Sequence, residues 1–169
     1  MLIGLYSGFS PISLFIRGFT MSDKSHASFV QEETGRTFEA WHNPGYFREV
    51  ANPWDKHTRG TKIRFYRHKR MTPDISAAIL AQCEEWARLK IKYDYLQVLR
   101  FLTRVHRREP VDRRLFCSEA VSIAFRKAGL QLLNADDSVI APHHLGWCTE
   151  LEEVTPPVSA WCFRGGVPV

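Results

Sequence analysis

The sequence predicts one α+β domain, in which a small antiparallel sheet packs against helices. Strand-like segments come first along the chain, and the strongest helix signals follow in the second half. The two types do not alternate as they do in a parallel α/β fold. A length of 169 residues, 44% of them hydrophobic, is enough for a core. We therefore expect residues 1–169 to form a single domain.

The first half of the chain carries mainly strand and turn signals. Residues 26–31 and 36–41 flank a Glu33-Thr34-Gly35 turn and are typical of a β-hairpin. Residues 62–67 alternate between apolar and polar positions, as a half-buried strand does. The other expected elements are a strand at 1–6, a short helix at 11–19 and a loop at 43–60.

Helix signals dominate from residue 72 onward. Thr72-Pro73-Asp74 combines an N-cap, a proline at the first helical position and an acid in the first turn. We expect this helix to reach about Lys90, with Leu89 on its buried stripe. Residues 117–128 repeat apolar side chains at helical spacing, and Gly129 is a natural end. A helix at 95–105, a turn at 142–146 and a strand at 158–163 complete the prediction.

The charge and the N-terminus bear on partners and location. The net charge of +5 favours anionic partners such as nucleic acid, a lipid head group or an anionic wall polymer, or else is a solvated basic surface. No nucleic-acid-binding motif accompanies the basic residues, so we expect no specific nucleic acid. The apolar start lacks a basic n-region and a cleavage site, and no apolar run is long enough to span a membrane. We expect a cytoplasmic protein.

Four cysteines are present, without a CxxC pair, and a chain of this size needs no disulfide framework. Cys117 differs from the others because it stands where a helix is expected to begin. The helix dipole and the free N–H groups there lower the pKa of a thiol and can hold an oxyanion. The alternative is that Cys117 is one more apolar residue on a buried stripe.

A thiol nucleophile needs a base, and histidine is the usual one. His26 begins an expected strand, where its ring can be held rigidly, and His42 follows the next strand. Three other histidines lie among charged residues and read as surface residues, and two follow Pro142 in the expected turn. These five are His57, His68, His106, His143 and His144.

The register of the expected hairpin selects among them. A loop of two or four residues pairs Ser28 with Glu39 and His26 with Trp41, so all four side chains share one face. His26 and Glu39 are then diagonal neighbours, and Glu39 can orient the imidazole as the third member of a triad does. A three-residue loop instead places Glu39 on the other face.

These motifs resemble a known family. The chain resembles the circularly permuted branch of the NlpC-type papain-like superfamily in four segments. These are the strand that begins at His26, the strand segment Thr37-Phe38-Glu39-Ala40, the segment Tyr93-Asp94-Tyr95, and the sequence Phe116-Cys117-Ser118-Glu119-Ala120-Val121. The YiiX-like proteins are the members it resembles. That branch places the histidine before the cysteine, and the similarity covers most of the chain.

The resemblance implies a permuted papain-like fold and a role for each motif residue. Cys117 is the expected nucleophile, His26 the general base and Glu39 the orienting residue. Tyr93 is expected near the nucleophile, where it supports the oxyanion or the substrate, or serves structure alone. The sequence departs from the family at Leu5-Tyr6-Ser7-Gly8 and Ala27-Ser28, in place of Gly-Asp and Val-Gly. These differences lie in the expected wall of the cleft, so they bear on which substrate is bound more than on the expected nucleophile and base.

The expected function is a cysteine peptidase or amidase that acts through a thioester, for example on cell-wall peptides. A wall substrate requires delivery by another system or a phage, because no signal peptide is expected. The alternatives are a thiol acyltransferase or esterase on lipids, a non-catalytic basic module that binds a polyanion, and a relative that has lost activity. No cofactor is expected, because the spacing of His143, His144, Cys148 and Cys162 fits no standard zinc pattern.

Overall fold

The structure is a computed structural model, and it describes residues 1–95 and 114–155. Within these residues eight strands form one curled sheet in the order β7-β6-β4-β3-β2-β1-β5-β8. Neighbouring strands are antiparallel, except that β6 and β7 are parallel. The strands are β1 (Leu2–Ser7), β2 (His26–Val30), β3 (Thr37–Trp41), β4 (Tyr46–Val50), β5 (Lys62–His68), β6 (Lys92–Tyr93), β7 (Arg114–Leu115) and β8 (Leu151–Val154).

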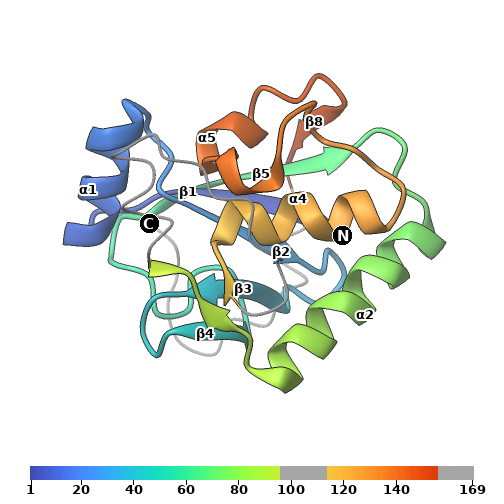
Figure 1. The fold of residues 1–169 in the computed structure, drawn as a ribbon, viewed down its shortest axis with the longest axis horizontal. Helices are drawn as coiled ribbons and strands as arrows, with labels where there is room; N and C mark the ends of the chain where they lie inside the picture. Colours follow the sequence, from blue (N-terminus) through green and yellow to red (C-terminus); the bar gives the residue numbers. More distant parts are fainter. Residues whose placement is uncertain (96–113, 156–169) are drawn as a thin grey trace.

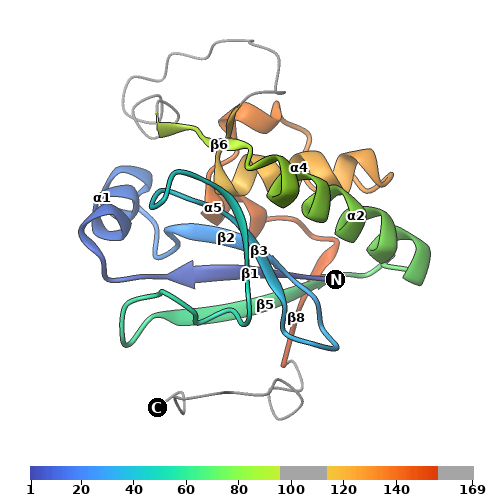
Figure 2. The same ribbon diagram turned by 90° about the horizontal axis from the view of Figure 1, so that it is seen from below.

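The two longest helices, α2 (Pro73–Leu89) and α4 (Cys117–Lys127), cover one face of the sheet, while α1 (Pro11–Thr20) stands at one end (Figures 1 and 2). A 3₁₀ turn, η2 (Asp137–Val139), and a short helix, α5 (Pro142–Leu145), follow α4. No helix in the described part of the chain is long and apolar enough to cross a membrane.

Local chemistry explains where the long helices begin and end. The Thr72 hydroxyl accepts from the Ile75 N–H at the start of α2, and Lys90 ends that helix in the left-handed conformation. At the start of α4, the Phe116 N–H donates to the Glu119 carboxylate at 3.1 Å. Gly129 follows α4 with a φ of +85°, which favours glycine. The helix starts expected at Pro73 and Cys117 are therefore confirmed.

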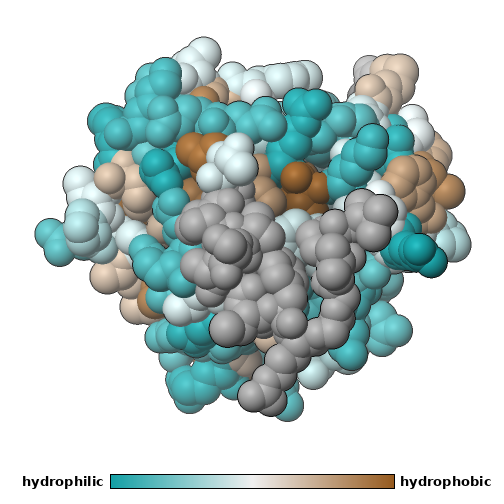
Figure 3. All heavy atoms as spheres, turned by 180° about the vertical axis from the view of Figure 1, so that it is seen from behind, coloured by the Kyte–Doolittle hydropathy of each residue, from teal (hydrophilic) through white to brown (hydrophobic). Residues whose placement is uncertain are grey.

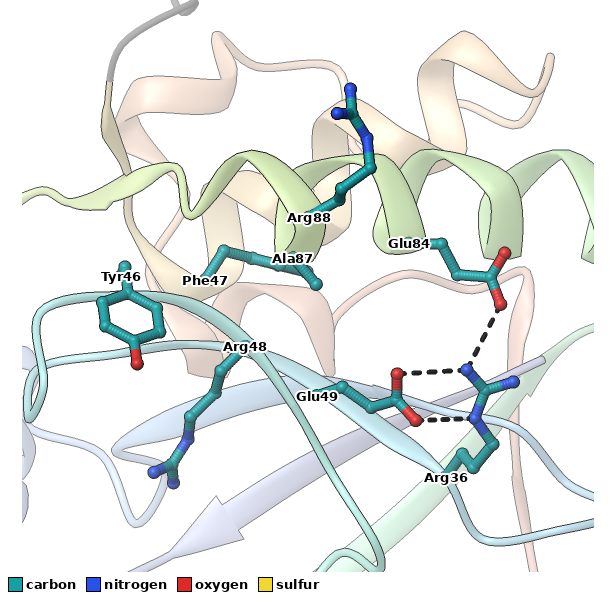
Figure 4. Close-up of a pocket in the computed structure, with 8 residues that line it drawn as sticks. All are labelled: Arg36, Tyr46, Phe47, Arg48, Glu49, Glu84, Ala87 and Arg88. Atoms are coloured by element: carbon teal, nitrogen blue, oxygen red, sulfur yellow. Dashed lines mark hydrogen bonds and ion pairs between the residues drawn. The ribbon is translucent and has the colours of Figure 1, made fainter.

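Strand alternation gives the sheet two different faces. Apolar side chains such as Ala27, Phe29 and Phe47 join α2 and α4 in the core. On β4, Phe47 lies toward Ala87 of α2, whereas Arg48 points away from that helix (Figure 4). The polar side chains of the central strands thus gather on the face that α2 does not cover.

The structure differs from the sequence prediction in several places. The expected loop at 43–60 contains β4, because Phe47 reaches the core although prolines and glycines flank the strand. The expected turn at 142–146 is the short helix α5, and β8 was not predicted. Leu89 is exposed, and Cys83 instead occupies the buried stripe of α2. The expected helix at 95–105 lies outside the described residues except at its first position. The expected strand at 158–163 lies wholly outside them.

Candidate active site

His26 and Glu39 meet on neighbouring strands. The β2–β3 ladder pairs Phe29 with Phe38 and Val30 with Thr37, which is the register predicted for a hairpin with an even loop. The Nε2 atom of His26 lies 2.7 Å from Oε2 of Glu39, and both side chains are buried. The predicted shared face of these two residues is confirmed.

Arg48 completes the surroundings of the Glu39 carboxylate from the next strand. It is directly opposite Glu39 in the β3–β4 ladder, and its Nε and Nη2 atoms donate to Oε1 at 3.0 and 2.7 Å. Burial alone raises the pKa of Glu39, but the hydrogen bond from His26 and the nearby His57 ring outweigh it and hold the pKa well below its usual value. Glu39 is therefore a carboxylate.

The charge of Glu39 fixes the tautomer of His26. A carboxylate can only accept hydrogen bonds, so Nε2 of His26 carries the proton and donates. Burial lowers the pKa of His26, and the opposing effect of Glu39 does not restore it. The ring is thus neutral near pH 7, and its Nδ1 atom keeps a lone pair that can take a proton.

Cys117 is the first residue of α4, as predicted, and its side chain is buried. Burial raises the pKa of the thiol to about 12, although the backbone N–H groups of Ala27, Ser118 and Cys117 itself act in the opposite direction. The N–H groups at the helix start lower this pKa as expected, but the expectation of a lowered net pKa is wrong for the resting protein. Removal from water outweighs the helix N–H groups.

Cys117 contacts the backbone of β2 at the residue next to His26. The Ala27 N–H, which interacts with the thiol, belongs to the residue after His26, and the charge of Glu39 also acts on the thiol. The β2–β3 pairs begin only at Phe29, so the two strands separate on the His26 side of the ladder. Within the described residues, no hydrogen bond joins the thiol to the His26 ring.

Tyr93 lies in β6 and borders Cys117. Burial raises the pKa of Tyr93 well above its usual value, and the second cause of the increase is Cys117. Its ring is 5.8 Å from that of Phe116, the residue before the nucleophile candidate. Tyr93 also lines a cavity of about 400 Å³, together with Pro44, Gly45, Tyr46, Lys90, Lys92, Tyr95 and Arg114.

His57 is a site residue that the sequence analysis missed. We expected it at the surface, but its side chain is only 6% exposed and stacks on Tyr6 with ring centroids 4.4 Å apart. Its Nε2 atom is 3.4 Å from Oε2 of Glu39 and has no hydrogen-bond partner. The loop between β4 and β5 brings it there, and no local sequence pattern marks that contact.

His26, Glu39 and His57 form a group whose ligand atoms lie within 4.8 Å of one another, close enough to hold a metal ion. His143, His144 and Cys148 form no such group in the described part of the chain, and Cys162 lies outside it. His68 was also expected at the surface but is buried, and its Nδ1 accepts from the Arg70 N–H at 3.1 Å. His106 lies outside the described residues.

A larger cavity, of about 590 Å³, lies between α2 and β4 (Figure 4). Arg36 crosses it, with ion pairs to Glu49 at 2.8 Å and to Glu84 at 3.2 Å. Its lining contains neither cysteine nor histidine. We therefore assign the candidate chemistry to the region where the β2 backbone next to His26 meets the start of α4 at Cys117.

No protein-family model matches the sequence, and no curated protein matches it. Among solved structures, the chain is similar to the crystal structure of yiiX from Escherichia coli O157:H7, described as a metalloprotein of DUF1105. The TM-score is 0.68 with 18% identity, over 95% of this chain and 96% of that chain. The chain has a YiiX-like fold. This confirms the predicted resemblance at the level of fold and confirms the α+β class, and the YiiX-like fold accounts for nearly the whole chain.

Proposed function

We propose that the protein is a cysteine hydrolase with a permuted papain-like arrangement, which transfers an acyl group through a thioester on Cys117. One observation carries the proposal. Glu39 holds His26 through Nε2, so the lone pair of Nδ1 is free, and the next residue along β2 meets the thiol of Cys117. A fixed base at the residue next to the one that contacts the thiol, with that thiol at a helix start, supports nucleophilic acyl transfer, which requires base and thiol to come together.

The reaction follows from these positions. Nδ1 of His26 takes the thiol proton while the sulfur of Cys117 bonds to the substrate carbonyl carbon. The carbonyl oxygen becomes an oxyanion, and the N–H groups at the start of α4 stabilise it. The carbon–nitrogen bond then breaks, and His26 returns its proton to the leaving amine. Water attacks the thioester with His26 again as base, and the proton ends on the released thiol.

The resting pKa values make proton transfer part of the attack. The pKa of Cys117 is about 12 and that of His26 is lowered, so the pair rests as thiol and neutral imidazole. Positive charge on His26 develops only as the sulfur reacts, and the Glu39 carboxylate stabilises it. Glu39 is thus a positioning residue that acts through His26.

The cavity beside Tyr93 indicates the substrate class. Lys90, Lys92 and Arg114 line it, so it favours an acyl donor that carries negative charge. A peptide amide with a free carboxylate, as in cell-wall stem peptides, fits this chemistry. A phospholipid ester has the same charge, and hydrolysis of matched amide and ester substrates distinguishes the two.

The test is labelling with a fluorescent iodoacetamide probe, followed by mapping of the modified cysteine. We expect the wild type to be labelled at Cys117 and the His26→Ala variant to be labelled at least about tenfold more slowly. Cys83→Ser and Cys148→Ser serve as matched controls, since both cysteines are also buried. Labelling of Cys117 that does not change in His26→Ala contradicts the proposal.

A second candidate function is metal binding by His26, Glu39 and His57. Two histidines and a glutamate are a donor set that zinc accepts, His57 Nε2 has no hydrogen-bond partner, and yiiX is described as a metalloprotein. A cation bound there must replace the hydrogen bond between His26 and Glu39, and it also faces the positive charge of Arg48. Both effects oppose metal binding at this site, so we favour the hydrolase function over the metal-binding function.

Zinc titration by calorimetry separates the two candidates. The hydrolase proposal predicts that His57→Ala keeps its Cys117 labelling and that chelators do not change that labelling. If wild type binds zinc with micromolar or tighter affinity and His57→Ala does not, the metal function is supported.

A further inference from the structure

An apolar patch lies on and around α1. Eight large hydrophobic side chains are exposed among the described residues, and five of them fall within residues 9–21. We call these five the docking face: Phe9, Leu14, Phe15, Phe19 and Met21. Apolar side chains gather at the edge of the molecule where α1 stands (Figure 3). A contiguous apolar patch on a protein surface commonly marks a binding surface.

The geometry of α1 explains why these side chains do not reach the core. Ile16 is the one buried residue of α1, and Ile12 packs against the core from one turn earlier. Leu14 lies on the opposite side, while Phe15 and Phe19 border the buried stripe, remain half exposed, and have ring centroids 4.5 Å apart. The helix is therefore apolar toward the sheet and apolar toward the outside.

Basic side chains lie near the Phe9 end of the docking face. The Phe9 N–H donates to the Thr58 hydroxyl at 3.3 Å, and Gly60 lies beside the Phe9 ring. The segment that contains these contacts carries exposed Lys56, Arg59 and Lys62. Arg17 lies over the Phe9 ring at 5.6 Å.

The nearby acidic residues do not cancel this charge. Asp23 is paired with Lys24 at 2.7 Å, and Asp55 is a single further carboxylate in the neighbouring loop. The four basic residues Arg17, Lys56, Arg59 and Lys62 outnumber the one acidic residue, Asp55, that is not already paired with Lys24. The Phe9 end of the docking face is therefore positively charged.

We propose that the docking face seats the protein on an anionic lipid bilayer. Phenylalanine, leucine and methionine side chains enter the boundary between head groups and acyl chains, while the basic residues contact anionic head groups. The face is a helix at the end of the molecule and not a groove, so it suits a flat lipid surface better than a peptide (Figures 1 and 2). This docking does not depend on the proposed chemistry of Cys117.

Docking in this orientation holds a third cavity near the membrane. Ser10, the N-cap of α1, and Ser13 within α1 line a cavity of about 380 Å³ together with Trp41, Arg48 and His57. That cavity adjoins the His26–Glu39 face. A substrate anchored in the same bilayer is then concentrated next to the candidate active site.

The experiment is co-sedimentation with vesicles of phosphatidylcholine alone and of phosphatidylcholine with phosphatidylglycerol. We expect binding to the anionic vesicles that weakens with added salt, and little binding to the neutral ones. Leu14→Glu and Phe15→Glu should each weaken binding at least about tenfold. Leu89→Glu is the matched control, because Leu14 and Leu89 are both 51% exposed on helices, and it should bind like the wild type.

Three results overturn the proposal. The first is that the wild type does not sediment with anionic vesicles. The second is that the Leu14→Glu and Phe15→Glu variants bind the vesicles as the wild type does. In the third, sedimentation velocity shows a dimer that Leu14→Glu dissociates, in which case the docking face is an interface between two copies of this chain. Cys117→Ser should bind vesicles normally, so a failure of the hydrolase proposal leaves this one intact.

Discussion

His26 donates a hydrogen bond of 2.7 Å from its Nε2 atom to Glu39, thirteen residues later in the chain and one strand away. This bond decides which nitrogen of the ring carries the proton. It leaves Nδ1 as the acceptor for the thiol proton, and it places a buried negative charge where the imidazolium forms. Three single substitutions and one pH series test the candidate site.

Glu39→Gln should reduce the labelling of Cys117 and any hydrolysis by about 10²–10⁴-fold, because the neutral amide can present its NH₂ group to Nε2 and stabilise the wrong tautomer. The measurement is the pseudo-first-order labelling rate at pH 7. Glu49→Gln is the control, since it makes the same change on the adjacent strand in an exposed ion pair with Arg36. Equal rates in both variants contradict the orienting role of Glu39.

Arg48→Met should lower the free energy of unfolding by about 3–5 kcal/mol, because it leaves the buried Glu39 carboxylate without its cation. The Arg48 side chain is 14% exposed and that of Glu39 is 0% exposed, so water does little to replace the pair. Urea unfolding followed by tryptophan fluorescence measures the change. Arg36→Met removes an exposed pair and should cost about 1 kcal/mol or less. A similar small loss in Arg48→Met shows that water reaches Glu39.

In the His26→Ala variant, the alkylation rate of Cys117 should rise about tenfold per pH unit from pH 7 to 10 without a plateau, because a thiol with a pKa of about 12 that has lost its base reacts only through its small thiolate fraction. Hydrolysis, which needs neutral His26, should hold its rate as the pH falls to 6.5. It should decline only below that pH, because the folded protein lowers the pKa of His26 from 6.5. An alkylation plateau near pH 8 instead shows a stabilised thiolate.

The sequence predicted the parts of this site that depend on local pattern. Of the two loop lengths left open by the sequence, the even one gives the observed hairpin register, and it placed Glu39 beside His26. The helix that starts at Cys117 follows from its apolar spacing. The approach of His57 could not be predicted, because a loop between two strands sets it and no periodicity constrains a loop.

The error about the Cys117 pKa has a different cause. A helix start was visible in the sequence, but the depth of burial was not, and burial outweighs the N–H groups. The same limit applies to β4, whose five residues were hidden between Pro44-Gly45 and the charged loop that follows. Both depend on contacts between elements distant in the chain.

Tyr93→Phe should separate a role in catalysis from a role in packing. The phenol of Tyr93 lies near Cys117, so loss of its hydroxyl removes a donor for the oxyanion while the ring remains to pack against Phe116. We expect kcat for hydrolysis to fall about 10²-fold or more, with little change in KM or in the midpoint of urea unfolding. Tyr95→Phe is the control, because that ring lines the same cavity but is 52% exposed. A lower unfolding midpoint with unchanged kcat assigns Tyr93 to the core alone, and the oxyanion then depends on the backbone N–H groups at the start of α4.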